Sequence, residues 1–177
     1  MLNWPVRLLL LAAMLSLTAC GLHLRGHGAA TRHFAFHSIY IDAPADTDFT
    51  KALVRGLKRY KLDVEQDSGK QQLTVQVISE STEKQITALN ASGHVVEYLL
   101  HYRVMLRAYD QEHDDWLPPT KISLQRILPY DVTLVLAKQL EEQMLYKDMR
   151  TDAADQVLRR LAYLKPPKPA ASGGAQP

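Results

Sequence analysis

The 177-residue sequence holds a single cysteine, Cys20, so the chain has no framework of internal disulfides. Its charges nearly balance, with 21 lysines and arginines against 19 aspartates and glutamates, which excludes the dominant basic face of a general nucleic-acid binder. The longest apolar run, "LLLLAAMLSLTA", is shorter than the about 20 residues that a membrane-spanning helix needs. These absences leave a chain whose stability must come from a packed core.

Motifs of catalysis are also missing. The sequence has no GxSxG elbow, no P-loop and no HExxH pair. Two of its histidine pairs, His23/His27 and His33/His37, have a spacing that in a strand separates side chains by about 13 Å, too far to share one metal. Acidic residues of segment 141–155 alternate with basic ones, as on a solvated helix face. We therefore expect no enzyme, no metal site and no cofactor.

Residues 1–19 have the composition of a secretory signal, because Arg7 precedes a short apolar core. The segment runs into "LTAC", which resembles the lipobox of bacterial lipoproteins. There a diacylglyceryl group is attached to the thiol, here that of Cys20, the chain is cut before it, and the new amine is acylated. Each buried methylene contributes about 0.8 kcal/mol, so several acyl chains hold a protein on a membrane. An uncleaved anchor with an incidental cysteine is the alternative. Gly21, in place of an aspartate, favours the outer membrane by resemblance to other lipoproteins.

The rest of the chain is predicted to form one α+β domain, residues 33–164. Residues 20–32 read as a flexible leash. Residues 165–177, "KPPKPAASGGAQP", read as a disordered tail because they are rich in proline and glycine and lack aliphatic residues larger than alanine. The periodicity of apolar residues predicts one helix within 46–62, capped by Asp46 or Thr47. Four strands are predicted at 34–42, 71–89, 94–110 and 120–129.

The strand at 94–110 carries the clearest pattern. Its even positions are all apolar or aromatic, as expected for a strand with one face on the core. They are Val96, Tyr98, Leu100, Tyr102, Val104, Leu106 and Ala108. The odd positions are mixed and include Glu97, His101, Arg103 and Arg107, which should meet water or a polar partner.

A long helix from about 132 to 164 should follow Asp131, its expected cap. Its apolar rows are Leu136, Leu140 and Met144, then Met149, Ala153, Val157, Leu161 and Leu164. Such a helix and the 94–110 strand are each about 50 Å long, so we expect them to lie along one another for their full length. The predicted fold is an elongated two-layer sandwich, with an about four-stranded, mostly antiparallel sheet and two helices packed on one face.

Five segments taken in order resemble the LptE family of lipopolysaccharide-assembly lipoproteins. They are "LTAC", "GLHLRG", "VVEYLLHYRVMLRAYD", "LQRILPYD" and "LAKQLEEQMLYKDMRTDAADQVLRRL", and they extend from Cys20 to about Leu164. The resemblance implies an outer-membrane lipoprotein that plugs the lumen of the β-barrel LptD one to one. It also implies that the protein helps the barrel assemble and binds lipopolysaccharide on its way to the cell surface.

The resemblance also implies residue roles. Lys138, in "LAKQ", matches a lipopolysaccharide-binding lysine of the family, and Arg126, in "LQRIL", matches an arginine that either binds this ligand or pairs within the fold. A family arginine at the turn before the "EY" strand has no basic counterpart in "LNASGH", where His94 is the nearest ionisable group. The polar odd positions of the 94–110 strand would face a polar barrel lumen.

Two other functions compete with this one. A stand-alone, periplasm-facing lipoprotein that binds peptidoglycan or a small ligand should carry a concave pocket on the uncovered sheet face. A lipoprotein hydrolase would need a nucleophile and base, which the sequence does not indicate.

Overall fold

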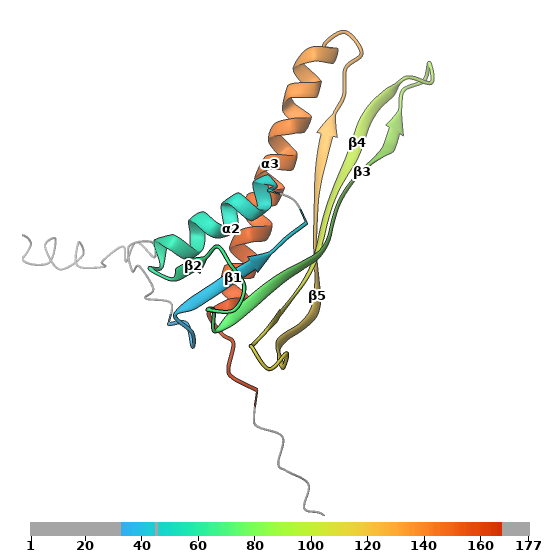
Figure 1. Ribbon diagram of the computed structural model, residues 1–177. Helices are drawn as coiled ribbons and strands as arrows, with labels where there is room; N and C mark the ends of the chain where they lie inside the picture. The colour runs from blue at the N-terminus through green and yellow to red at the C-terminus, as the bar shows by residue number, and fades with distance from the viewer. Residues whose placement is uncertain (1–32, 45, 168–177) are drawn as a thin grey trace, which may run out of the picture. The chain divides into compact units, whose positions relative to one another are not determined.

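The computed structural model describes residues 33–44 and 46–167. They form β1 (Ser38–Asp42), α2 (Asp48–Arg59), β2 (Asp63–Glu65), β3 (Leu73–Leu89), β4 (Val95–Tyr109), β5 (Asp115–Pro129) and α3 (Val135–Leu161). Both helices lie on one face of a single sheet, which confirms the predicted α+β class (Figure 1). The predicted signal, Cys20, the leash and most of the predicted tail lie outside the described residues.

The strands are ordered β2-β1-β3-β4-β5. β1 pairs in parallel with β2 and β3, whereas β3, β4 and β5 are antiparallel neighbours. The sheet is therefore mixed and has five strands, one more than predicted, because the three residues of β2 are too few to show a periodic pattern. β5 begins five residues before the predicted strand and contains Pro118 and Pro119, which are tolerated because β5 is an edge strand.

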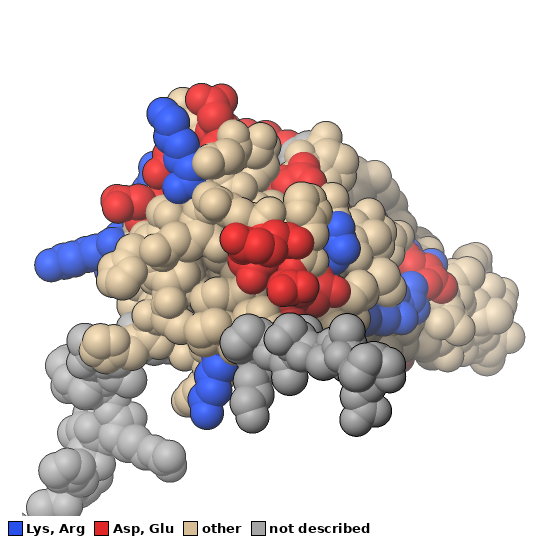
Figure 2. Space-filling view, turned by 60° about the horizontal axis from the view of Figure 1, so that its bottom comes forward, with Lys and Arg blue, Asp and Glu red and all other residues tan. Residues whose placement is uncertain are grey.

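Two tight turns close the antiparallel hairpins at opposite ends of β4. The β3–β4 turn spans 90–94 and the β4–β5 turn spans 110–114. The β4–β5 turn and the start of β5 carry four acidic residues, at 110, 112, 114 and 115. Figure 2 brings forward the end of the domain toward which this turn points, and acidic side chains gather on that face.

The core lies between the sheet and the two helices. The even positions of β4 from Leu100 to Ala108 are buried, as its period of two predicted. α2 buries its predicted apolar face, and its N-cap is Thr47, whose Oγ1 accepts a hydrogen bond from the Thr50 backbone nitrogen at 3.3 Å. Where α2 crosses α3, Gly56 lies against Leu158 so closely that a Cβ at this position would overlap the leucine side chain. The crossing therefore requires a residue without a side chain.

α3 departs from prediction at its beginning. It starts at Val135, its N-cap Leu134 makes no side-chain cap, and Asp131 is not the cap. The Asp131 carboxylate instead accepts hydrogen bonds from the backbone nitrogen and the hydroxyl of Thr133, at 2.8 and 2.7 Å. Because the carboxylate is used in this local turn, the helix begins one turn later than expected.

The fully buried residues of α3 all lie in its second half, and Leu145 and Tyr146 pack against the core only in part. Met149, Ala153, Val157 and Leu161 are buried, whereas Leu136, Leu140 and Met144 are exposed by 72%, 55% and 65%. A helix turns about 100° per residue, so the five-residue step from Met144 to Met149 rotates the apolar row by about 140° to another side of the helix. The expectation that α3 and β4 pack along their full length is therefore wrong.

Candidate functional site

Lys138 lies near the start of α3, at the end of the domain that also carries the β3–β4 turn (Figure 1). We call this end, residues 84–98 and 127–142, the distal end. Here the apolar row of α3 points away from the sheet, and polar side chains connect the helix to β3. Lys84 Nζ lies 2.6 Å from Glu142 Oε2, and the Tyr146 hydroxyl donates to the backbone oxygen of Glu83 at 2.9 Å. Polar contacts therefore add to the partial packing of Leu145 and Tyr146 in holding this half of the helix.

Lys84 also lies against two aromatic rings. Its Nζ is 4.1 Å from the centroid of the Tyr98 ring and 5.7 Å from that of Tyr130, and the two rings meet edge to face at 5.1 Å. A cation over an aromatic face is attracted by the quadrupole of the ring. The sequence analysis missed Lys84, because a lysine within a mixed polar strand gives no signal of the rings beside it.

Lys138 is held by its own helix. Its Nζ lies 2.8 Å from Glu141 Oε2, and only 17% of its side chain is exposed. Hydrogen bonds from Thr133 hold the pKa of the nearby Asp131 below its ordinary value, and the charge of Lys138 adds to this effect. An incoming anion would therefore have to compete with Glu141 for the ammonium group.

Arg126 occupies a different place. Its Nη2 lies 2.6 Å from Asp152 Oδ2 and ties β5 to the buried half of α3. Asp152 is 14 residues after Lys138, about 21 Å along the helix. The two residues matched to ligand binding therefore do not converge on one site.

His94 ends the β3–β4 turn. Its backbone nitrogen donates to Asn90 Oδ1 at 2.9 Å, and its backbone oxygen accepts from the Asn90 nitrogen at 2.8 Å. Residues 85–96 contain no aspartate, glutamate, lysine or arginine, so the turn has no permanent charge.

The uncovered face of the sheet is an ordered polar surface. Arg103 Nη1 lies 2.6 Å from Glu83 Oε2, and this hydrogen bond and charge hold the pKa of Glu83 below its ordinary value. Arg107 donates from Nε to Gln76 Oε1 at 2.8 Å, and its guanidinium lies 4.6 Å from the Tyr109 ring centroid. The sequence predicted this polar face but not the pairs across it, because the partners on β3 depend on the register.

Two further predicted members of this face differ from one another. Glu97 Oε1 accepts a hydrogen bond from the Thr87 hydroxyl at 2.8 Å and stays partly exposed. His101 is buried, with 7% exposed, and its Nδ1 has no hydrogen-bond partner within the described residues. Only part of the polar row therefore contacts solvent.

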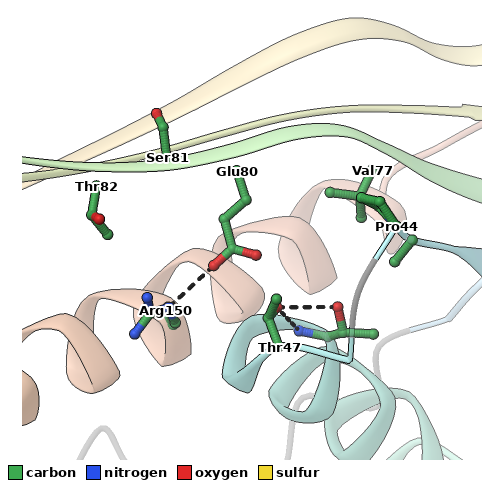
Figure 3. Close-up of a pocket in the computed structure, with 9 residues that line it drawn as sticks. Pro44, Thr47, Val77, Glu80, Ser81, Thr82 and Arg150 are labelled. Atoms are coloured by element: carbon green, nitrogen blue, oxygen red, sulfur yellow. Dashed lines mark hydrogen bonds and ion pairs between the residues drawn. The ribbon is translucent and has the colours of Figure 1, made fainter.

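A pocket opens on the helix-covered face between β3, α3 and the start of α2 (Figure 3). It encloses about 310 Å³, and Glu80 and Arg150 form an ion pair across it, with Nε and Oε1 3.1 Å apart. Thr47 and Thr82 line the same pocket. Burial and the Glu80 carboxylate raise the pKa of Tyr102, whose ring lies 5.7 Å from the Arg150 guanidinium. The acid and the base of this pocket neutralise each other, and the pocket is not on the uncovered face.

Metal ligands do not gather within the described residues, where no group of three or more histidine, cysteine, aspartate or glutamate side chains could hold an ion. In the same residues no helix is both long enough and apolar enough to span a membrane.

Comparison with known proteins gives one consistent result. The family model LptE, described as lipopolysaccharide-assembly, matches residues 36–161. The solution structure of an uncharacterized lipoprotein B from Nitrosomonas europaea is 36% identical, covers 80% of this chain and 90% of its own, and has a TM-score of 0.66. Rare lipoprotein B from Shewanella oneidensis is 25% identical, with 71% and 93% covered and a TM-score of 0.63. A minor lipoprotein from Acinetobacter baumannii shares the fold at 21% identity, with 73% and 93% covered and a TM-score of 0.61. No curated protein sequence matches the chain.

Proposed function

Because this chain belongs to the LptE family of lipopolysaccharide-assembly proteins, we propose that it plugs the lumen of an LptD-type β-barrel in the outer membrane. It helps this barrel assemble, binds lipopolysaccharide and aids its delivery to the cell surface. The role is not enzymatic. The thiol of Cys20 receives a diacylglyceryl group, residues 1–19 are then removed, and the new amine is acylated. These chains anchor the protein in the membrane.

The proposal of a plug rests on the uncovered face of β3, β4 and β5. Arg103 is paired with Glu83, Arg107 donates to Gln76 and Glu97 accepts from Thr87, so the surface is polar and many of its charged groups are already hydrogen-bonded. The lumen of a transmembrane barrel is polar and accepts such a surface. A barrel wall can cover the paired part of this face at a lower desolvation cost, because Arg103 and Glu83 already neutralise each other.

Lys138 is the residue we assign to lipopolysaccharide. A phosphate that displaces Glu141 would form a charge-assisted hydrogen bond with an ammonium already held in place by its surroundings. Arg126 is a secondary contact, because its guanidinium is engaged with Asp152 and is distant from Lys138.

The alternative is a stand-alone lipoprotein that binds peptidoglycan or a small ligand, and the pocket of Figure 3 does not favour it, because it lies on the helix-covered face. Purification from outer membranes through a C-terminal tag separates the two functions. The plug predicts a stable one-to-one complex with one very large barrel. It also predicts that a photo-crosslinking residue at Ser123, which is exposed on the uncovered face, attaches to that barrel. Recovery of the chain alone, with no adduct at Ser123, would refute the plug and leave the stand-alone binder.

A further inference from the structure

Exposed apolar side chains are concentrated at and next to the distal end. Among the described residues, twelve large hydrophobic side chains are exposed, and all but Ile78 and Tyr163 belong to this region. They are Ile86, Leu89, Val96, Ile127, Val132, Leu134, Val135, Leu136, Leu140 and Met144. All but Met144 lie on the distal end itself, and the last two, Leu140 and Met144, continue the exposed row of Leu136 along α3. We call the first eight the apolar tip.

The apolar tip is not confined to one face of the sheet. Ile86 pairs with Tyr98 on the helix-covered face, whereas Ile127 pairs with Leu99 on the uncovered face, and the two are 53% and 57% exposed. A docking site for one flat protein surface needs only one apolar face. A tip that is apolar on both faces fits a medium that surrounds it, in the same way that a helix apolar all round fits a buried position.

The two hairpins of the sheet provide an internal comparison. In each turn the backbone nitrogen of the first residue donates to the backbone oxygen of the fifth. The backbone nitrogen of the fourth residue donates to the backbone oxygen of the first. In each, the side-chain oxygen of the first residue, Asn90 or Asp110, accepts from the backbone nitrogen of the fifth. The fourth residues, Gly93 and His113, both have positive φ. The turn geometry therefore accepts charged residues, yet only the β4–β5 turn has them. The fold therefore does not require the β3–β4 turn, which we call the distal turn, to lack charged residues.

The backbone of the distal turn can also leave water at little cost. Asn90 Oδ1 accepts from the nitrogens of Ser92 and His94, and Gly93 donates to the Asn90 backbone oxygen at 3.0 Å. An unpaired backbone donor is costly in an apolar medium, and here most donors of the turn are paired internally. Next to the tip lie the rings of Tyr98 and Tyr130, with the ammonium of Lys84 over them. Side chains with an apolar body and a polar end are common where an apolar medium meets water.

We propose that the apolar tip receives the acyl chains of lipopolysaccharide, while the phosphates of the ligand stay at the level of Lys138. This inference rests on the proposed function. It places the acyl chains against residues 86–96 and against the segment just before α3. Asp131 is the only aspartate, glutamate, lysine or arginine in these two segments.

A tryptophan reporter tests the contact. The full chain carries Cys20→Ser, so that no acyl group of its own occupies the tip, and its two native tryptophans, Trp4 and Trp116, are replaced by phenylalanine. Ser92→Trp then reports on the distal turn. Glu112→Trp, at the same third position of the acidic turn, is the matched control, and both sites are exposed. Each variant is titrated with intact lipopolysaccharide and with the same lipopolysaccharide after complete deacylation.

The expected result is a blue shift of the Ser92→Trp emission with intact ligand only, and no shift for Glu112→Trp. A charge at the tip, Ser92→Glu, should weaken binding of intact ligand at least tenfold and leave binding of deacylated ligand unchanged. Binding of lipopolysaccharide without a shift, or an equal shift with deacylated ligand, overturns the acyl contact alone. Absence of any binding overturns the proposed ligand as well. The same emission can be measured in the complex with the barrel. If the Ser92→Trp emission is already blue-shifted there without ligand, and ligand does not change it, then the barrel protein and not the acyl chains covers the tip.

Discussion

The contact of Gly56 with Leu158 permits a sharp test of the packing between α2 and α3. Gly56→Ala adds a methyl group where the leucine side chain already lies. Alanine is the better helix former by about 1 kcal/mol, but a methyl group forced into a packed core costs about 1–3 kcal/mol. Leu158 is 1% exposed and has little room to move. We therefore expect the free energy of unfolding to fall by about 1 kcal/mol.

The sign of this effect should reverse when the leucine is shortened. Leu158→Ala alone should lower the free energy of unfolding by about 2–5 kcal/mol, because it leaves a cavity. In that background the methyl group of Gly56→Ala meets open space and keeps its helix propensity, so it should stabilise the protein by about 1 kcal/mol. The coupling between the two sites is then about 2 kcal/mol, within the range for residues in contact.

Urea unfolding followed by circular dichroism measures all four chains, each made with Cys20→Ser to avoid detergent. Leu140→Ala is the control for leucine truncation on the same helix, and its exposed side chain should change stability by less than about 0.5 kcal/mol. If Gly56→Ala stabilises the protein equally in both backgrounds, the helices do not cross as closely as described.

Three further outcomes are expected. Lys138→Asp should weaken lipopolysaccharide binding and leave the circular dichroism spectrum unchanged, and equal affinity in a direct titration would remove this residue from the site. Cys20→Ser should give a soluble periplasmic protein that still co-purifies with the barrel, and failure to co-purify would show that the acyl anchor provides the main attachment. The side-chain carboxyl of Glu83, followed by carbon-detected NMR, should titrate below an ordinary glutamate, and Arg103→Ala should raise its pKa toward the ordinary value. Because the folded pKa is depressed, the contribution of this pair to stability is present above the unfolded pKa and is lost as pH falls through the folded one.

The parts of the fold that were predicted correctly are those in which one local pattern decides the structure. The pattern of β4 was interpreted correctly from Leu100 to Ala108, where the core lies against one of its faces. α2 keeps its apolar residues on one side, and Thr47 precedes them in the position of a cap. The family-specific segments include β4, the end of β5 and nearly all of α3, but they do not include α2.

The packing of α3 was harder to predict, because its two apolar rows give the same local signal. The row of Leu136 and the row of Met149 both have i, i+4 spacing, and which row meets the sheet depends on the angle at which the helix leaves it. Lys84 beside Tyr98 and the ion pair between Glu80 and Arg150 join residues far apart in the chain. Such contacts depend on register and helix placement, and no periodicity in the sequence encodes them.

The unequal distribution of the core along β3, β4 and α3 has a consequence for how the protein opens. Amides near Val104 and Val157 lie within the buried half and should exchange with deuterium only when the whole domain unfolds. Amides near Leu89 and Leu136 lie where few apolar contacts hold the chain, so they should exchange through small local openings. We expect the second region to be loosely held in the free protein and, if the proposed partner or ligand covers it, to gain protection in the complex.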